Sequence, residues 1–212
     1  MKGKVSKNKF LKVVLPALLV VAIICQAVGF QAVLAKGNVA TTSSDSISNL
    51  TDQQLQALTN PILQSYKADS SHKVWKMTDD SRLAVLANQT NIENARLQEV
   101  VKLVNSEFVE KEIISSPLAM VYAQERDVSY GDILIDIDQT SSITSSSNSK
   151  EAYKITIGEN GVRLTGASEN AIMHGLRTIQ NLIITNDGLV YGEIVDYPNV
   201  AERRVHVDCA RK

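Results

Sequence analysis

The chain has 212 residues, of which 44% are hydrophobic and 21% charged, with 10 Gly and 4 Pro. This composition excludes collagen, a coiled coil, wholesale disorder and a small disulfide-rich scaffold, and the length predicts about one domain with appendages. The net charge of −1 combines a cationic start, with five lysines and no acid in residues 1–35, and a remainder of 17 basic and 23 acidic residues. Nucleic-acid binding needs a clustered basic face, which the acidic remainder lacks.

The first 35 residues have the pattern of an export signal. Five lysines precede an apolar run over residues 13–25, and Ala-Val-Leu-Ala closes the segment at 32–35. The small residues there suit cleavage before Lys36. Residues 13–35 also match the roughly 20 helical residues that cross a bilayer, so an uncleaved anchor is the alternative. We expect a secreted or cell-surface protein that touches a membrane only through this segment.

Cysteine usage fits an exported protein without structural disulfides. The only cysteines are Cys25 and Cys209, and cleavage of the leader removes the first. One thiol forms neither an internal disulfide nor a cysteine metal cluster. Together with the lysine-rich leader, this favours a Gram-positive source.

The exported part divides by composition. Residues 36–64 are rich in Ser, Thr, Asn and Gln, so they bury too little apolar surface to order themselves and predict a linker. From residue 65, short apolar and alternating runs predict strands. We expect these strands at 72–77, at 82–86, from 121 and at 131–138, with a polar loop at 139–149.

Two helices and a hairpin complete the predicted domain. Apolar residues at three- and four-residue spacing predict helices over 91–109 and 168–184, the second with Ser168 as its N-cap. Two strands flank Asn160-Gly161, a pair that tolerates positive φ and predicts a hairpin. The order of elements predicts an α+β domain of one sheet layer and one helix layer over residues 65–195.

No group of residues in 36–195 has a catalytic or metal-binding pattern. Gly158, Gly161 and Gly166 fit turns in a hairpin and match no phosphate-binding loop. Three aspartates share one side of a predicted strand but lack the glycine and distal glutamate of a calcium loop, which favours a solvated strand edge; they are Asp132, Asp136 and Asp138. The histidines have no ligand spacing. We therefore expect no metal and no cofactor.

Two segments carry a resemblance to a known family. Residues 166–182 resemble the helix that ends the small domain of glycoside hydrolase family 20, the β-N-acetylhexosaminidases. Residues 196–211, which begin Asp-Tyr-Pro, resemble the opening of that family's catalytic barrel. The resemblance covers about residues 65–212 and implies that residues 196–212 begin a (β/α)₈ barrel. Since such a barrel needs about 250 residues, we expect a truncated one here.

The resemblance also assigns roles to residues. Arg203 matches the arginine that hydrogen-bonds sugar hydroxyls in the family, a role suited to the planar guanidinium. Asp208 and Arg211 match residues of the first barrel strand with a structural or supporting role. Arg204 stands where the family has Gly, so either Arg203 or Arg204 faces the sugar. The alternative is that all three arginines only neutralise nearby carboxylates.

The family cleaves terminal N-acetylhexosamine, or in some branches lacto-N-biose, from glycans with retention, using the substrate's own acetamido oxygen. The catalytic aspartate and glutamate are adjacent in that family, and this sequence contains no Asp-Glu dipeptide. The resemblance thus implies an N-terminal fragment of a secreted hexosaminidase that is inactive by itself and has no catalytic residue. A stand-alone cell-surface accessory or carbohydrate-binding module is the alternative.

Overall fold

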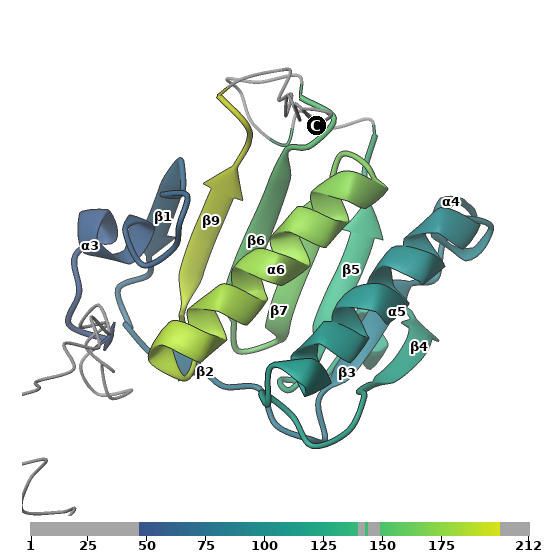
Figure 1. Cartoon of the computed structure of the whole chain (residues 1–212), viewed down its shortest axis with the longest axis horizontal. Coiled ribbons are helices and arrows are strands. Elements are labelled where there is room, and N and C mark those ends of the chain that lie inside the picture. The colour runs from purple at the N-terminus through teal and green to yellow at the C-terminus, as the bar shows by residue number, and fades with distance from the viewer. Residues whose placement is uncertain (1–46, 140–142, 144–148, 200–212) are drawn as a thin grey trace, which may run out of the picture. The chain divides into compact units, whose positions relative to one another are not determined.

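A seven-stranded mixed sheet forms the centre of the folded part of the chain (Figure 1). The computed structural model describes residues 47–139, 143 and 149–199, which belong to the structural unit Ala40–Lys212. In spatial order the strands are β1 (Ser65–Ala68), β9 (Gly192–Asp196), β6 (Tyr153–Gly158), β7 (Gly161–Gly166), β5 (Ile133–Ile137), β3 (Arg82–Leu86) and β4 (Ala119–Ala123). A separate two-stranded sheet pairs β2 (Val74–Trp75) with β8 (Leu189–Val190).

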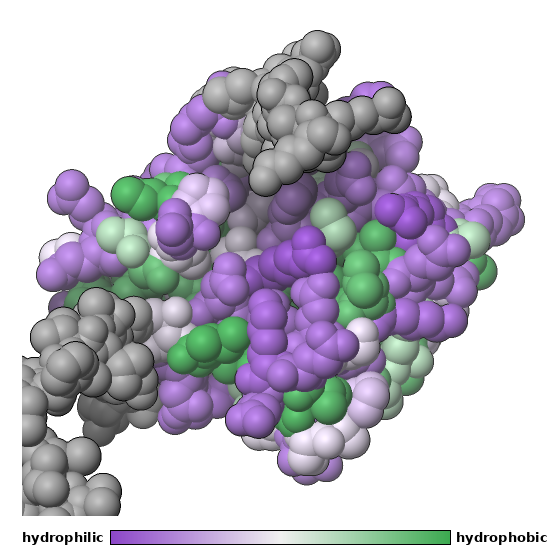
Figure 2. All heavy atoms as spheres, viewed as in Figure 1, coloured by the Kyte–Doolittle hydropathy of each residue, from purple (hydrophilic) through white to green (hydrophobic). Residues whose placement is uncertain are grey.

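Two long helices, α5 (Ala95–Glu110) and α6 (Glu169–Asn186), lie side by side over one face of the sheet (Figure 1). Helix α6 begins at the predicted cap, where the Ser168 hydroxyl accepts a hydrogen bond from the Ala171 amide. It ends where Asp187 adopts left-handed φ and ψ. The view of this face shows mainly hydrophilic residues, with hydrophobic ones in small separate groups (Figure 2).

The predicted helix at 91–109 is two helices in the structure. A short helix α4 (Gln89–Ile92) precedes α5, and each has its own asparagine cap. The Asn88 side chain accepts a hydrogen bond from the Asn91 amide, and the Asn94 side chain accepts one from the Leu97 amide. A capping asparagine satisfies the free N–H groups at a helix start and so allows a new helix to begin.

The sheet is parallel on one side and antiparallel on the other. Strand β5 pairs in parallel with both β3 and β7, and β4 extends this parallel part at the edge. Strands β1, β9, β6 and β7 are mutually antiparallel neighbours. This mixed α/β arrangement with few helices agrees with the expected layers of sheet and helix. The predicted leader at 1–35 and residues 200–212 of the predicted barrel start lie outside the described residues.

The core lies between the sheet and the two helices. One large cluster includes Leu83, Ile135 and Leu164 from central strands, together with Phe108 of α5 and Ile179 of α6. Because neighbouring strand residues point to opposite faces, a second, smaller cluster lies on the other face of the sheet. It contains Ala84, Ala123 and Leu134.

The predicted hairpin is confirmed, with a difference in its turn. Strands β6 and β7 pair in antiparallel register up to Gly158 and Gly161, which leaves Glu159 and Asn160 in the turn. Gly161 has a φ of 90°, whereas Asn160 does not have positive φ. A side chain at Gly161 is disfavoured by that φ and would also contact the Asp132 carbonyl oxygen.

The folded domain begins before residue 65, within the segment expected to be a linker. Ile47 and Leu55 are each 1% exposed, and Leu63 is 4% exposed. Leu55 belongs to the short helix α3 (Asp52–Gln56), which starts with a reciprocal capping box between Thr51 and Gln54 and packs beside β1. The segment is polar on average, so its composition gave no sign of these few apolar residues. Their burial stabilises the ordered conformation of the segment.

The expectation of a solvated strand edge is wrong for Asp132 and Asp136, whereas Asp138 is half-buried just beyond the end of β5. Strand β5 is a central strand, and Asp132 and Asp136 are 1% and 8% exposed. Arg82 compensates the charge of Asp132 through Nε and Nη2, at 2.9 and 2.5 Å from the two carboxylate oxygens. The Ser129 amide donates a third hydrogen bond at 2.8 Å. Among the described residues, no group of three or more His, Cys, Asp or Glu side chains is arranged to hold a metal.

These contacts also fix the ionisation of Asp132. Burial raises the pKa of its carboxyl group, but the hydrogen bonds from Arg82 and Ser129 and the charge of Arg82 outweigh burial, so the pKa lies below its usual value of 3.8. A lowered pKa contributes stability above pH 3.8 that is lost as the pH falls through the folded-state pKa.

We predict that Asp132→Asn lowers the free energy of unfolding by about 2 kcal/mol at pH 7, because a buried acceptor of hydrogen bonds is lost beside a charged partner. Urea unfolding at pH 7 and pH 3 measures the difference. The gap between wild type and variant should narrow at pH 3, where the wild-type carboxylate loses its advantage. The exposed Asp127→Asn is the control and should change stability by less than about 0.5 kcal/mol. A gap that stays constant or widens at pH 3 would contradict the ion pair.

Candidate functional site

A cavity of about 530 Å³ lies where the chain leaves the domain after β9. Its lining includes the loop before β1, residues 59–64, and residues 196–199 at the end of β9. Helix α6 contributes His174, Arg177, Thr178 and Asn181. We call this region the exit corner. Its lining thus comes from three parts of the sequence, and more than 100 residues separate the first part, 59–64, from the last, 196–199.

The carboxylate of Asp196 is bound from two sides at the exit corner. Its Oδ1 accepts a hydrogen bond from the backbone N–H of Gln64 at 3.2 Å, and its Oδ2 accepts one from the Tyr153 hydroxyl at 2.8 Å. The Tyr153 oxygen also lies 2.6 Å from Oγ1 of Thr178 on α6. Since the single Tyr153 proton goes to the carboxylate, Thr178 is the donor in that second contact. Loop, sheet and helix thus meet at one carboxylate.

The same contacts change the acidity of Tyr153. Burial raises the pKa of its hydroxyl well above the usual value of 10.0, and the negative charge of Asp196 raises it further. The hydrogen bond with Thr178 acts in the opposite direction but is outweighed. Tyr153 is therefore a neutral donor of a hydrogen bond and not a base.

Gln64 continues the contact beyond the end of β9. Its Nε2 donates to Oδ1 of Asn199 at 2.7 Å and to the carbonyl oxygen of Tyr197 at 3.4 Å. These contacts hold Asp196-Tyr197-Pro198-Asn199, the segment with which the barrel-like sequence begins. Arg177 in the same cavity is bound to Glu107 of α5 at 3.1 and 2.5 Å, which connects the two helices and lowers the pKa of Glu107.

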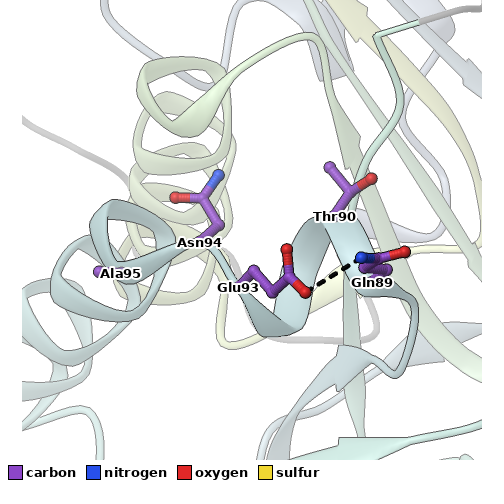
Figure 3. A pocket seen from close by; sticks show the side chains of 5 residues that line it. All are labelled: Gln89, Thr90, Glu93, Asn94 and Ala95. Carbon is purple, nitrogen blue, oxygen red and sulfur yellow. Dashed lines mark hydrogen bonds between the residues drawn. The ribbon is translucent and has the colours of Figure 1, made fainter.

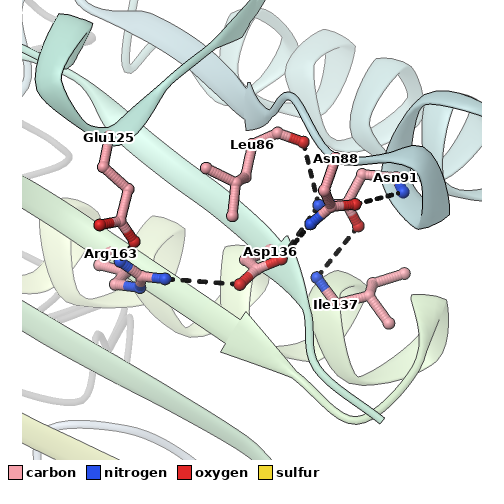
Figure 4. A network of polar contacts seen from close by, with 7 residues as sticks. All are labelled: Leu86, Asn88, Asn91, Glu125, Asp136, Ile137 and Arg163. Carbon is pink, nitrogen blue, oxygen red and sulfur yellow. Dashed lines mark hydrogen bonds and ion pairs between the residues drawn. The ribbon is translucent and has the colours of Figure 1, made fainter.

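A second polar network lies on the face of the sheet opposite the two long helices (Figure 4). Asp136 accepts hydrogen bonds from Nδ2 of Asn88 at 3.2 Å and of Asn91 at 3.0 Å, and Arg163 lies 3.4 Å from its other oxygen. Arg163 also pairs with Glu125. Every charged group of this network has a partner in the protein, so its role is to hold α4 and the segment after β4 on the sheet.

A further hollow lies at the start of α5 (Figure 3). Gln89 and Glu93 hydrogen-bond across it at 3.1 Å, and Thr90, Asn94 and Ala95 complete the lining. These side chains include no nucleophile paired with a base, which acyl transfer requires.

The structure does not test the site residues that the sequence predicts. Arg203, Arg204, Asp208 and Arg211 lie outside the described residues. In the described ranges, no helix is both long and apolar enough to span a membrane. Sequence reasoning missed Gln64, which stands at the end of a polar segment without any motif. The spacing of Tyr153 in its strand predicts burial, and burial of a tyrosine calls for a hydrogen-bond partner.

Comparison with known families identifies the domain. Residues 59–197 match the family model described as glycosyl hydrolase family 20, domain 2. The chain belongs to glycosyl hydrolase family 20. The match confirms the family and the non-catalytic domain that the resemblance implied. It includes the loop at 59–64 as well as Asp196 and Tyr197, so both sides of the exit corner are part of the family's domain 2.

Solved structures share this fold at low sequence identity. Flavobacterium johnsoniae chitobiase is 14% identical over 71% of this chain and 22% of its own, with a TM-score of 0.51. Streptomyces plicatus N-acetyl-β-hexosaminidase, solved in complex with Thio-NAglucal, is 15% identical over 72% of this chain and 28% of its own, with a TM-score of 0.51. The chain thus spans less than a third of either protein. No curated protein matches the sequence.

We predict that Tyr153→Phe lowers the free energy of unfolding by about 1–2 kcal/mol at pH 7, since Asp196 and Thr178 both lose a partner. Because the folded-state pKa of Tyr153 is raised, its contribution is complete below pH 10 and is lost as the pH rises further. Urea unfolding at pH 7 and pH 11 should show the gap between variant and wild type shrink.

The matched control is Tyr122→Phe, at a position that is 43% exposed on β4. It should change stability by less than about 0.5 kcal/mol at either pH. The assignment fails if Tyr153→Phe is as stable as wild type at pH 7, or if its deficit is the same at pH 11.

Proposed function

We propose that this chain is the N-terminal part of a β-N-acetylhexosaminidase that hydrolyses terminal N-acetylhexosamine-containing glycans. In this proposal residues 59–197 form the non-catalytic domain, and the sequence from Asp196 begins a catalytic barrel. The observation that carries it is the family match, which ends at Tyr197, one residue after the barrel-like sequence starts at Asp196. The two solved relatives above are described as a chitobiase and an N-acetyl-β-hexosaminidase, and each is more than three times as long as the matched region.

The described domain supplies no acid–base pair for glycoside cleavage. A retaining mechanism with two carboxyl groups places them about 5–5.5 Å apart on either side of the scissile bond. The buried carboxylates here are instead engaged by protein donors: Asp132 by Arg82, and Asp136 by asparagines and Arg163. Hydrolysis in this proposal uses the substrate's acetamido group and an Asp-Glu pair from a continuing barrel.

The proposed role of Arg203 is to hydrogen-bond hydroxyls of the bound sugar, with Asp208 and Arg211 supporting the first barrel strand. The domain serves as a scaffold that holds the beginning of the barrel through the exit corner. We also propose export through residues 1–35, which places the enzyme outside the cell with glycan substrates.

Turnover of nitrophenyl N-acetylglucosaminide tests the proposal. The 212-residue chain should release no nitrophenol, whereas a longer protein that continues this chain with an Asp-Glu pair should release it. Glycan binding by the 212-residue chain together with an inactive longer protein would contradict the proposal and favour a binding module.

In the active longer protein, Arg203→Ala should raise KM and lower kcat, with a fall in kcat/KM between about 10- and 100-fold, because a charged hydrogen-bond donor to the sugar is lost. Arg204→Ala is the matched control, since it removes the same charge one residue away. Unchanged kinetics in Arg203→Ala, with a loss in Arg204→Ala, would transfer the sugar contact to Arg204.

A further inference from the structure

The backbone pairing of β9 ends at Asp196. Val195 pairs with Ser65 of β1, and Asp196 pairs with Tyr153 of β6. Beyond this pairing, side-chain contacts hold residues 197–199. Gln64 supplies two of them, to the Tyr197 carbonyl and to the Asn199 side chain.

Gln64 is itself held firmly. It directly precedes Ser65, the first residue of β1, and its backbone amide is bound to the Asp196 carboxylate. The preceding residue, Leu63, is buried, and its amide donates to the Gln56 carbonyl at 3.2 Å. The amide side chain of Gln64 therefore extends from a fixed point of the sheet edge toward residues 197–199.

We propose that Gln64 is a positioning residue for residues 197–199, where the barrel sequence begins in the function proposed above; this inference rests on that function. Asp196 is the last residue of β9 that strand pairing holds. Beyond it, the Gln64 side chain binds the Tyr197 carbonyl and the Asn199 side chain. Gln64 thus holds residues 197–199 against the loop before β1.

The side-chain amide of Gln64 suits this role, and its replacement by a carboxylate gives a specific test of it. Both contacts use N–H groups of its amide, and both acceptors are oxygens. Gln64→Glu keeps the shape but places a carboxylate oxygen against these acceptors and near Asp196, which converts attraction to repulsion. Catalysis is sensitive to such displacement, since a misplacement of about 1 Å can reduce the rate about 100-fold.

The kinetic test uses the longer, active protein and nitrophenyl N-acetylglucosaminide. Gln64→Glu and Gln64→Ala should lower kcat/KM about tenfold, mainly through kcat. Gln53→Ala, at an exposed glutamine of α3, is the matched control and should turn over as wild type does. The Tm of Gln64→Ala should stay within about 2 °C of the control, because one of the lost hydrogen bonds is exposed and the other is long and only partly buried.

A double variant separates positioning from general damage. Asn199→Ala removes the acceptor at 2.7 Å but leaves the Tyr197 contact, so its loss of kcat/KM should be no larger than that of Gln64→Ala, and the double variant should fall little below Gln64→Ala. A fully additive loss would show that the two side chains act independently and would overturn the proposal.

A second readout is independent of activity. In the 212-residue chain, Gln64→Ala should lower the NMR order parameters of the Tyr197 and Asn199 amides, because the contacts that hold these two residues are lost, while the order parameters within β6 stay as in wild type. Order parameters that are unchanged at Tyr197 and Asn199 would overturn the positioning role.

The two proposals fail in different ways. If the longer wild-type protein has no turnover, the proposed function is contradicted, and the order parameters of Tyr197 and Asn199 alone decide whether Gln64 positions these residues. If the wild type is active but both Gln64 variants turn over like Gln53→Ala, the positioning role is wrong and the glycosidase assignment stands.

Discussion

The organisation of this domain depends on the hydrogen bonds that the Asp196 carboxylate accepts. It accepts hydrogen bonds from the Gln64 amide and the Tyr153 hydroxyl, and Tyr153 in turn contacts Thr178 of α6. One side chain therefore connects the loop before β1, the middle of the sheet and the helix layer. A buried tyrosine with a raised pKa remains a neutral donor, so the contact stays intact over the physiological pH range.

The rest of the fold brings these three parts to one place. Strand β9 lies between β1 and β6, and so the last strand of the domain ends beside residues from its beginning and its middle. The ion pair between Arg177 and Glu107 connects α6 to α5. On the other face of the sheet, Asp136 accepts hydrogen bonds from Asn88 and Asn91 and so connects α4 to β5. The polar contacts of Asp196, Asp136 and the Arg177–Glu107 pair each connect different elements of the domain.

Local patterns predicted much of this structure, and the failures have physical causes. The Asn-Gly turn, the cap at Ser168 and the spacing of apolar residues located the hairpin and both long helices. The position of β5 at the centre of the sheet depends on strand order, which alternation within one strand does not encode, so Asp132 was expected at a solvated edge. Gln64 acts through residues more than 130 positions away, and a lone glutamine in a polar segment carries no local sign of such a contact.

A double-mutant cycle between Asp196→Ala and Tyr153→Phe tests the central contact most directly. Urea unfolding at pH 7 of the wild type, both single variants and the double variant gives the coupling free energy of the pair. We predict a coupling of about 1 kcal/mol or more, because each single variant already removes the shared hydrogen bond. Additive losses, with a coupling near zero, would show that the two side chains stabilise the domain independently and would contradict the account.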